Sequence, residues 1–322
     1  MVHITFRGIG ILKEEIVDGF KFVALNYPFN HKEAIKIEVD TKPIDSYIAY
    51  INERKIEQAE IIMPDLNILN FCPTLKYLKI RPSYNSIDNF DFTPLYNATE
   101  IKSLNCLNRY GDRKQFISEI DYSYISGLVD LSIAVNKGTF GYNKVKTLKS
   151  LDVGGFIGKK RDISDLFCSS QLDTLRLIQC GVCSLDGIEI SSKMQCVYLH
   201  YNRSLRDISM LKKVKKTLKA LRVENCPRIE DFSVLYELEN LELLELWGSN
   251  TLESLDFLKG MKGLKTFVFN MNVLDGNLSN CLNLPHVVSC VNRKHYNLKD
   301  SQLPKGIFVR GNEDIEPWRR LE

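Results

Sequence analysis

The segment LDTLRLIQC, residues 172–180, is one of six variants of a single nine-residue pattern in this chain. The other five are LKSLDVGGF (148–156), MQCVYLHYN (194–202), LKALRVENC (218–226), LELLELWGS (241–249) and LKTFVFNMN (264–272). All six have apolar residues at positions one, four and six, and successive copies start 24, 22, 24, 23 and 23 residues apart. A period of about 20–29 residues predicts a stack of short structural repeats.

The alternation within each copy predicts a β-strand. Because successive side chains of a strand face opposite sides, Leu175 and Leu177 should face a core, while Arg176 should face away from it. Leu172 and Cys180 should turn into the core at the two ends of the strand. The predicted strands cover residues 76–80, 102–106, 129–133, 149–153, 173–177, 195–199, 219–223, 242–246 and 265–269.

A second apolar run follows most of these strands, as in LRDISML (205–211), IEDFSVL (229–235) and LESLDFL (252–258). Strand pattern and return segment together resemble the leucine-rich repeat family, in particular short cytoplasmic bacterial forms with internalin-like or phosphatase-regulator-like repeats. The resemblance implies an α/β solenoid in the form of a right-handed curved horseshoe. Its parallel β-sheet would line the concave face, with short helices, 3₁₀ turns or irregular segments on the convex side.

The ninth position of the pattern has a defined role in this family, where its side chain bonds the backbone of its turn and forms a ladder along the solenoid. A short polar side chain or a thiol can make such bonds. The residues at this position are Asn136, Cys180, Asn202, Cys226, Ser249 and Asn272, with Phe156 as a departure.

The repeats also suggest the domain organisation. Three looser copies begin at Leu75, Ile101 and Leu128, and atypical units are expected near Ile56 and over residues 284–292. We therefore expect a solenoid of about nine to eleven units over residues 56–292. Residues 1–55 would form an N-terminal cap of strands with one short helix near 43–51, and residues 293–322 a C-terminal cap or tail.

Composition limits the possible partners and location. With 43 basic and 40 acidic residues, the net charge of +3 does not favour nucleic-acid binding. No apolar run approaches the ~20 residues of a membrane span, and the N-terminus lacks the pattern of an export signal. Nine cysteines, an odd number, fit buried thiols in a reducing compartment. We expect a cytoplasmic monomer.

Little in the sequence points to catalysis. The five histidines form no metal-binding pattern, and there is no P-loop, GxSxG or GxGxxG. Cys180 and Cys183 form a CxxC, but no second pair completes a zinc site, and Cys180 already has a place in its repeat. We expect structural thiols, with no metal and no cofactor. A thiol-dependent enzyme using Cys180 and Cys183 stays open as an alternative.

The informative chemistry is on the side chains that the strands turn away from the core. In the second half of the chain these are rich in Tyr, Trp, Arg and His, the types that carry most binding energy at protein interfaces. The simpler interpretation of Trp247 is that it covers Arg222 or Leu243. The predicted partner-binding residues are Arg176, Tyr198, His200, Tyr201, Arg222, Glu224, Glu245, Trp247 and Asn270.

These features favour a non-enzymatic scaffold that binds another protein, of unknown identity, through the concave face. An immunity protein that neutralises a polymorphic toxin is the narrower alternative.

Overall fold

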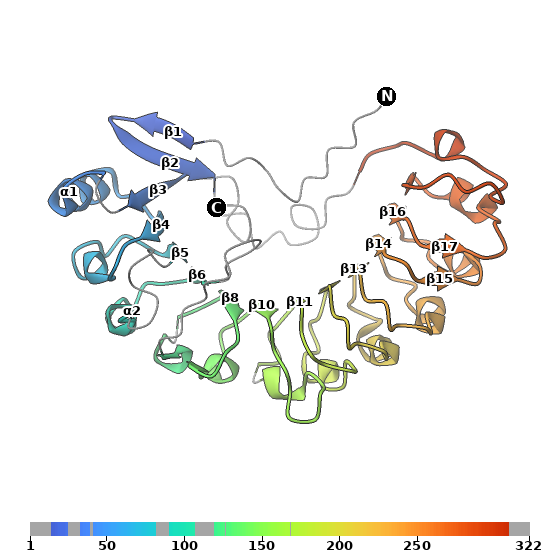
Figure 1. The fold of residues 1–322 in the computed structure, drawn as a ribbon, viewed down its shortest axis with the longest axis horizontal. Helices are drawn as coiled ribbons and strands as arrows, with labels where there is room; N and C mark the ends of the chain where they lie inside the picture. Colours follow the sequence, from blue (N-terminus) through green and yellow to red (C-terminus); the bar gives the residue numbers. More distant parts are fainter. Residues whose placement is uncertain are drawn as a thin grey trace. The chain divides into compact units, whose positions relative to one another are not determined.

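Strands that follow one another in chain order build this protein, as the computed structural model shows (Figure 1). The structure describes residues 14–24, 33–38, 41–81, 90–106, 119–125, 127–167 and 169–308. The chain divides into two units. The first contains Met1–Ser132, Lys137–Phe140 and Arg319–Glu322, and the second contains Ile133–Asn136 and Gly141–Trp318.

The first unit begins with a hairpin and continues as a parallel sheet. Strand β1 (Glu14–Val17) is antiparallel to β2 (Phe20–Ala24), and β2 is antiparallel to β3 (Glu33–Glu38). From β3 onward the pairing is parallel, through β4 (Gln58–Ile62), β5 (Tyr77–Ile80), β6 (Ser103–Asn105) and β8 (Asp130–Ala134). A short parallel pair joins β7 (Ile120–Asp121) to β9 (Thr139–Phe140).

Helix α1 (Ile44–Arg54) connects β3 to β4. Pro43 precedes its first turn, Asp45 lies in that turn, and Lys55 ends the helix in the left-handed conformation. Tyr47 and Ile51 are its buried residues. The helix expected near 43–51 is therefore present and extends three residues further. The other helical segments of this unit are η1 (Asn67–Asn70), α2 (Thr93–Asn97) and η2 (Tyr122–Tyr124).

The second unit contains seven parallel strands paired in chain order. They are β10 (Ser150–Gly154), β11 (Thr174–Ile178), β12 (Cys196–His200), β13 (Ala220–Glu224), β14 (Leu243–Trp247), β16 (Thr266–Phe269) and β18 (His286–Ser289). A smaller pair joins β15 (Thr251–Leu252) to β17 (Asn272–Val273). The pairing places equivalent repeat positions side by side, so that Leu175 lies opposite Val197 and Leu177 opposite Leu199.

Nine strands were predicted, and each begins one residue later than expected. The cause is visible at position two of the repeat. The backbone N–H groups of Asp173 and Thr174 both bond the carbonyl of Lys149, at 2.8 and 3.1 Å. The residue at position two thus enters the sheet, and regular pairing starts at position three. Parallel strands at 58–62 and 286–289 occupy the places of the two atypical units.

The apolar positions of the pattern form the core. Leu175, Leu177, Leu221 and Leu244 are fully buried, and so are apolar residues of the return segments such as Leu255. The return segments of the second unit contain short 3₁₀ helices: η3 (Tyr142–Lys144), η4 (Ser164–Leu166), η5 (Ile188–Ile190), η6 (Ser209–Val214), η7 (Ser233–Glu237), η8 (Asp256–Lys259), η9 (Ser279–Asn283) and η10 (Asp300–Gln302).

An aspartate starts many of these turns. The Oδ1 atom of Asp207 accepts a hydrogen bond from the backbone N–H of Ser209 at 2.8 Å, and Asp231 does the same for Ser233 at 2.7 Å. In the D-x-S sequence of the return segment, a side chain thus satisfies a backbone donor that a short helix leaves unpaired.

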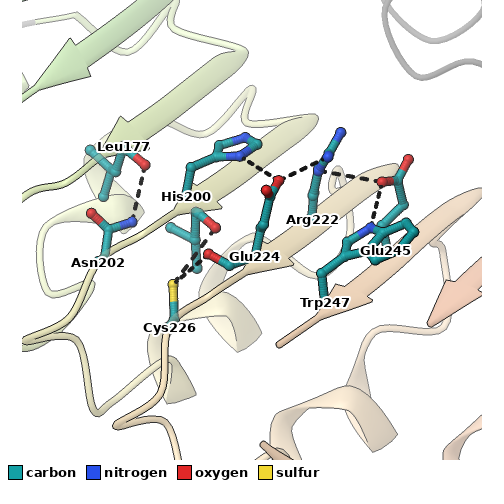
Figure 2. Close-up of polar contacts among 9 residues, drawn as sticks. Leu177, His200, Asn202, Arg222, Glu224, Cys226, Glu245 and Trp247 are labelled. Carbon is teal, nitrogen blue, oxygen red and sulfur yellow. Dashed lines mark hydrogen bonds and ion pairs between the residues drawn. The ribbon is translucent and has the colours of Figure 1, made fainter. Parts of the chain in front are cut away.

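The ladder expected at position nine is present at Cys180, Asn202 and Cys226. The thiol of Cys180 donates to the carbonyl of Val153 at 3.4 Å. One repeat on, the Asn202 amide donates to the carbonyl of Leu177 at 3.0 Å (Figure 2). The Asn202 side-chain oxygen accepts from the backbone N–H of Cys180 at 2.8 Å. Asparagine and cysteine therefore hold successive turns together in the same way.

One assignment in this ladder was wrong. Ser249 is exposed, and Asn250 takes its place, buried and donating to the carbonyls of Cys226 and Ile229 at 3.0 and 2.7 Å. An extra residue fits here because Gly248 adopts φ 141°, a conformation that L side chains rarely take.

Several expectations concern the ends of the chain. Residues 1–13 and 309–322 belong to the two expected caps. Both ranges lie outside the described residues. The last described residues pack on β18, where Lys305 forms an antiparallel bridge with His286. The expected division at residues 55 and 292 stays a prediction.

Candidate interaction surface on the concave face

Equivalent positions of neighbouring repeats form straight rows across the concave face, which we define as the side of the sheet turned away from the core. The position-five row of the second unit consists of Asp152, Arg176, Tyr198, Arg222 and Glu245, in register from β10 to β14. The position-seven row beside it contains His200, Glu224 and Trp247. Seven of the nine predicted binding residues therefore lie in two adjacent rows.

The β10–β12 part of the position-five row is buried. The guanidinium of Arg176 pairs with the carboxylate of Asp152 at 2.9 Å, and its Cζ atom lies 4.6 Å from the centre of the Tyr198 ring. Arg176 is 7% exposed and Tyr198 4%. Both were expected on the surface, but cross-strand neighbours satisfy the arginine and cover the ring. These two residues therefore contribute to packing between the strands and offer little surface for a partner.

A small apolar cluster also lies on this face, and it was not among the predicted features. It consists of Cys196, Tyr198, Ala220 and Leu243, all buried. Cys196, Ala220 and Leu243 occupy position three of successive repeats. Three apolar residues in a row at an outward position could have predicted this cluster. The cluster joins β12, β13 and β14 on the same face as the polar residues of positions five and seven.

The β12–β14 part of the rows is a connected polar network. His200 Nδ1 lies 3.0 Å from Glu224 Oε2, which also accepts from Arg222 Nη2 at 2.8 Å. Arg222 Nε lies 3.3 Å from Glu245 Oε2, an ionic contact without hydrogen-bond alignment. The Trp247 indole N–H donates to the same Glu245 oxygen at 3.0 Å. Figure 2 shows the five side chains joined by these contacts, and we call them the polar strip.

All five residues of the polar strip are half-buried. The side chain of Arg222 is 34% exposed, against 17% for Glu224 and 13% for Glu245. Trp247 is thus held by a directed hydrogen bond from its indole, which goes beyond the simple covering role that we considered for it. The arginine is the most open of the charged groups in the strip.

Burial and charge set the protonation of the strip. Burial lowers the pKa of His200 to about 4, and the positive charges of Arg176 and Arg222 act in the same direction. Burial alone would raise the pKa of Glu224, but the His200 hydrogen bond and Arg222 outweigh it and lower that pKa to about 2. At neutral pH the pair is therefore a neutral imidazole, donating from Nδ1, and a carboxylate.

The two remaining predicted residues lie at the turns that end the strands. Tyr201 has a left-handed backbone, with φ 55°, and its N–H donates to the carbonyl of Glu224 at 2.8 Å. Asn270 accepts from the backbone N–H of Gly248 at 2.7 Å. Asn270 therefore supports the turn that contains the extra residue, and neither residue is part of the polar strip.

The cysteines were the other candidate chemistry. Cys180 and Cys183 are both free, and burial raises the pKa of Cys180 to about 11. A nucleophilic or redox-active cysteine needs its thiolate, which this environment disfavours. Within the described ranges, no three His, Cys, Asp or Glu side chains are placed to hold a metal ion. In the same ranges, no helix is both long and apolar enough to cross a membrane.

Comparison with known proteins identifies the fold. No protein-family model and no curated protein sequence matches this chain. Among solved structures, an internalin of Listeria monocytogenes is 16% identical, with a TM-score of 0.51, over 79% of this chain and 73% of its own. Internalin C2 of the same organism is 17% identical, with a TM-score of 0.43, over 58% and 77%.

The mouse RP105/MD-1 complex contains a chain that is 14% identical, with a TM-score of 0.46, over 71% of this chain and 44% of that one. At these identities the similarity is one of fold, and the internalin match with a TM-score of 0.51 carries it. In its fold, the chain is a leucine-rich repeat solenoid similar to the internalins.

Proposed function

We propose that this protein is a non-enzymatic scaffold that binds another protein through the concave face, with the polar strip at the centre of the contact. The observation that supports this most is the connected network of His200, Arg222, Glu224, Glu245 and Trp247 across three strands. A leucine-rich repeat solenoid offers an extended surface, and such surfaces typically bind proteins.

The contacts within the polar strip favour binding because they fix side chains in advance. Arg222 is held by two carboxylates, and the Trp247 indole is held by one of them. Association normally costs free energy for each flexible side chain that it immobilises, and part of that cost has already been met during folding. Tryptophan and arginine are also the residue types most often found at interface hot spots.

The charges of the strip would orient the partner. Two carboxylates flank one guanidinium, with a neutral imidazole at one end and an indole at the other (Figure 2). An interface that complements this order needs a cation or hydrogen-bond donors opposite the glutamates and an acceptor opposite Arg222. Such complementarity sets specificity and association rate more than affinity.

A reducing location fits the cysteines. The eight cysteines in the described part of the chain are free, and six of them are buried. Burial raises the pKa of Cys106 and Cys281 to about 12, which keeps these thiols protonated and slow to oxidise. We therefore propose that the protein acts in the cytoplasm, where thiols stay reduced.

The test begins with affinity capture from the native host and identification of the retained proteins by mass spectrometry. The bait is the full chain in three forms: wild type, Trp247→Ala and Tyr236→Ala. Tyr236 is a matched control because it is an exposed aromatic residue on turn η7, away from the concave face. A true partner should be retained by the wild type and the Tyr236 variant and reduced on the Trp247 variant. Equal capture on all three would place the site elsewhere.

A further inference from the structure

Lysines from three separate segments meet at one edge of the sheet in the second unit. Strands β10 to β13 are parallel, so the segments that precede them all lie at the same edge. Backbone bonds at position two fix the alignment: the N–H of Asp173 bonds the carbonyl of Lys149, Gln195 bonds Asp173, and Lys219 bonds Gln195, at 2.7–2.8 Å.

Side-chain contacts place the neighbouring lysines at the same edge. The Ser169 hydroxyl donates to the carbonyl of Lys146 at 2.9 Å, and Lys193 Nζ donates to Gln171 at 2.6 Å. Lys212 and Lys213 lie in the last turn of η6, and Lys216 lies between η6 and the start of β13. We call the following six residues the lysine edge: Lys146, Lys149, Lys193, Lys212, Lys213 and Lys216.

All six are exposed, and within the described part of the chain none forms an ion pair. The acidic groups nearby do little to neutralise them. Asp173 is buried, and burial raises its pKa to about 7 although Lys149 and Lys193 oppose the shift. Glu237 and Glu242 are engaged with Lys215, Lys219 and Lys265 instead.

We propose that the lysine edge binds an acidic segment of a protein. From β10 to β13 there are three strand spacings, about 14 Å, which an extended peptide of about four or five residues would span. The cations are lysines without arginine, so they act as mobile point charges suited to carboxylates on a flexible chain. This surface lies at the strand ends, and its binding does not depend on the polar strip.

The charge pattern favours an acidic peptide over nucleic acid. At the next repeat, the same edge carries Glu237, Glu239 and Glu242, before Lys262 and Lys265 make it basic again. A continuous phosphate backbone that followed the edge would meet these carboxylates and be repelled. A short acidic segment confined to β10–β13 would not reach them.

The experiment measures fluorescence anisotropy of a labelled glutamate-rich peptide titrated with the full chain at low ionic strength. The test variant is Lys212→Glu/Lys213→Glu/Lys216→Glu. The matched control is Lys159→Glu/Lys160→Glu/Arg206→Glu, which makes the same change in net charge at exposed positions that follow the strands. Circular dichroism confirms that both variants fold. A single-stranded oligonucleotide of similar length serves as the second probe.

We expect the wild type and the control to bind the peptide, and the lysine-edge variant to bind at least about tenfold more weakly. Added salt should weaken wild-type binding, because exposed charges are screened. Absence of peptide binding by the wild type would overturn the proposal, and so would an equal loss in both variants. Tighter binding of the oligonucleotide with the same dependence on the lysine edge would assign the surface to nucleic acid instead. A failed Trp247 capture test would leave this result unaffected.

Discussion

At the scale of single residues, the position-nine ladder shows how different side chains serve one purpose. Cys180 and Asn202 both donate to a carbonyl of the preceding repeat, through sulfur at 3.4 Å and nitrogen at 3.0 Å. The position requires a short side chain that fits inside the turn and donates a hydrogen bond to a backbone carbonyl. Phe156, buried at the same position of its repeat, has no polar group to offer.

This role of the ladder predicts that Cys180→Ser is better tolerated than Leu177→Ala. Serine keeps a short donor at the turn, whereas the leucine truncation leaves a cavity in the core and should cost about 2–5 kcal/mol of unfolding free energy. Urea denaturation of the two variants makes the comparison. A larger loss for Cys180→Ser would indicate that the thiol has a role beyond this hydrogen bond.

His200 makes folding depend on pH. Its folded pKa of about 4 lies below the ordinary value of 6.5, so the unfolded chain takes up the proton first as the pH falls. This contribution to stability is complete above pH 6.5 and is lost progressively toward pH 4. The total is on the order of 3 kcal/mol. Glu224, with a pKa of about 2, adds a further loss below pH 4.5.

Between pH 7 and pH 5 the raised pKa of Asp173, about 7, acts in the opposite direction and adds stability as the pH falls. The prediction is that His200→Gln removes only the histidine contribution, so that the variant gains stability relative to the wild type as the pH falls from 7 to 5. Glutamine can still donate to Glu224, but it cannot take up a proton. The measurement is the urea midpoint as a function of pH for both proteins. An unchanged slope in the variant would mean that another group causes the pH dependence.

At the scale of elements, the repeat pattern predicted every strand of the regular copies, because two buried apolar side chains per strand leave little freedom of register. The start of each strand was missed by one residue, since the shared carbonyl at position two is a backbone feature with no side-chain signature. The sequence also assigned Ser249 to the ladder position that Asn250 occupies, because one inserted residue leaves the flanking pattern intact.

The 3₁₀ turns give a prediction at this scale. Asp207→Ala removes the acceptor for the Ser209 N–H and should cost about 1 kcal/mol, as loss of a helix N-cap does. Asp207→Asn keeps an acceptor oxygen and should cost less. Thermal unfolding of both variants tests the difference. Equal stability of wild type and the alanine variant would show that solvent replaces the aspartate at no cost.

At the scale of the whole molecule, the repeat spacing predicted the solenoid, whereas the sequence could not predict how the concave face is organised. Arg176 and Tyr198 were expected to be exposed and are buried, since cross-strand pairing depends on the side chains of the adjacent repeats. Conversely, His200, Arg222, Glu224, Glu245 and Trp247 lie together because in-register stacking brings distant segments side by side.

The proposed function requires that a partner docks on the polar strip. Isothermal titration calorimetry of the identified partner against wild type, Trp247→Ala and Tyr236→Ala tests it most directly. We predict that Trp247→Ala weakens binding by at least ~2 kcal/mol, the hot-spot threshold, with thermal stability nearly unchanged, while Tyr236→Ala binds like the wild type. Full affinity of the Trp247 variant, or equal losses in both variants, would contradict the claim.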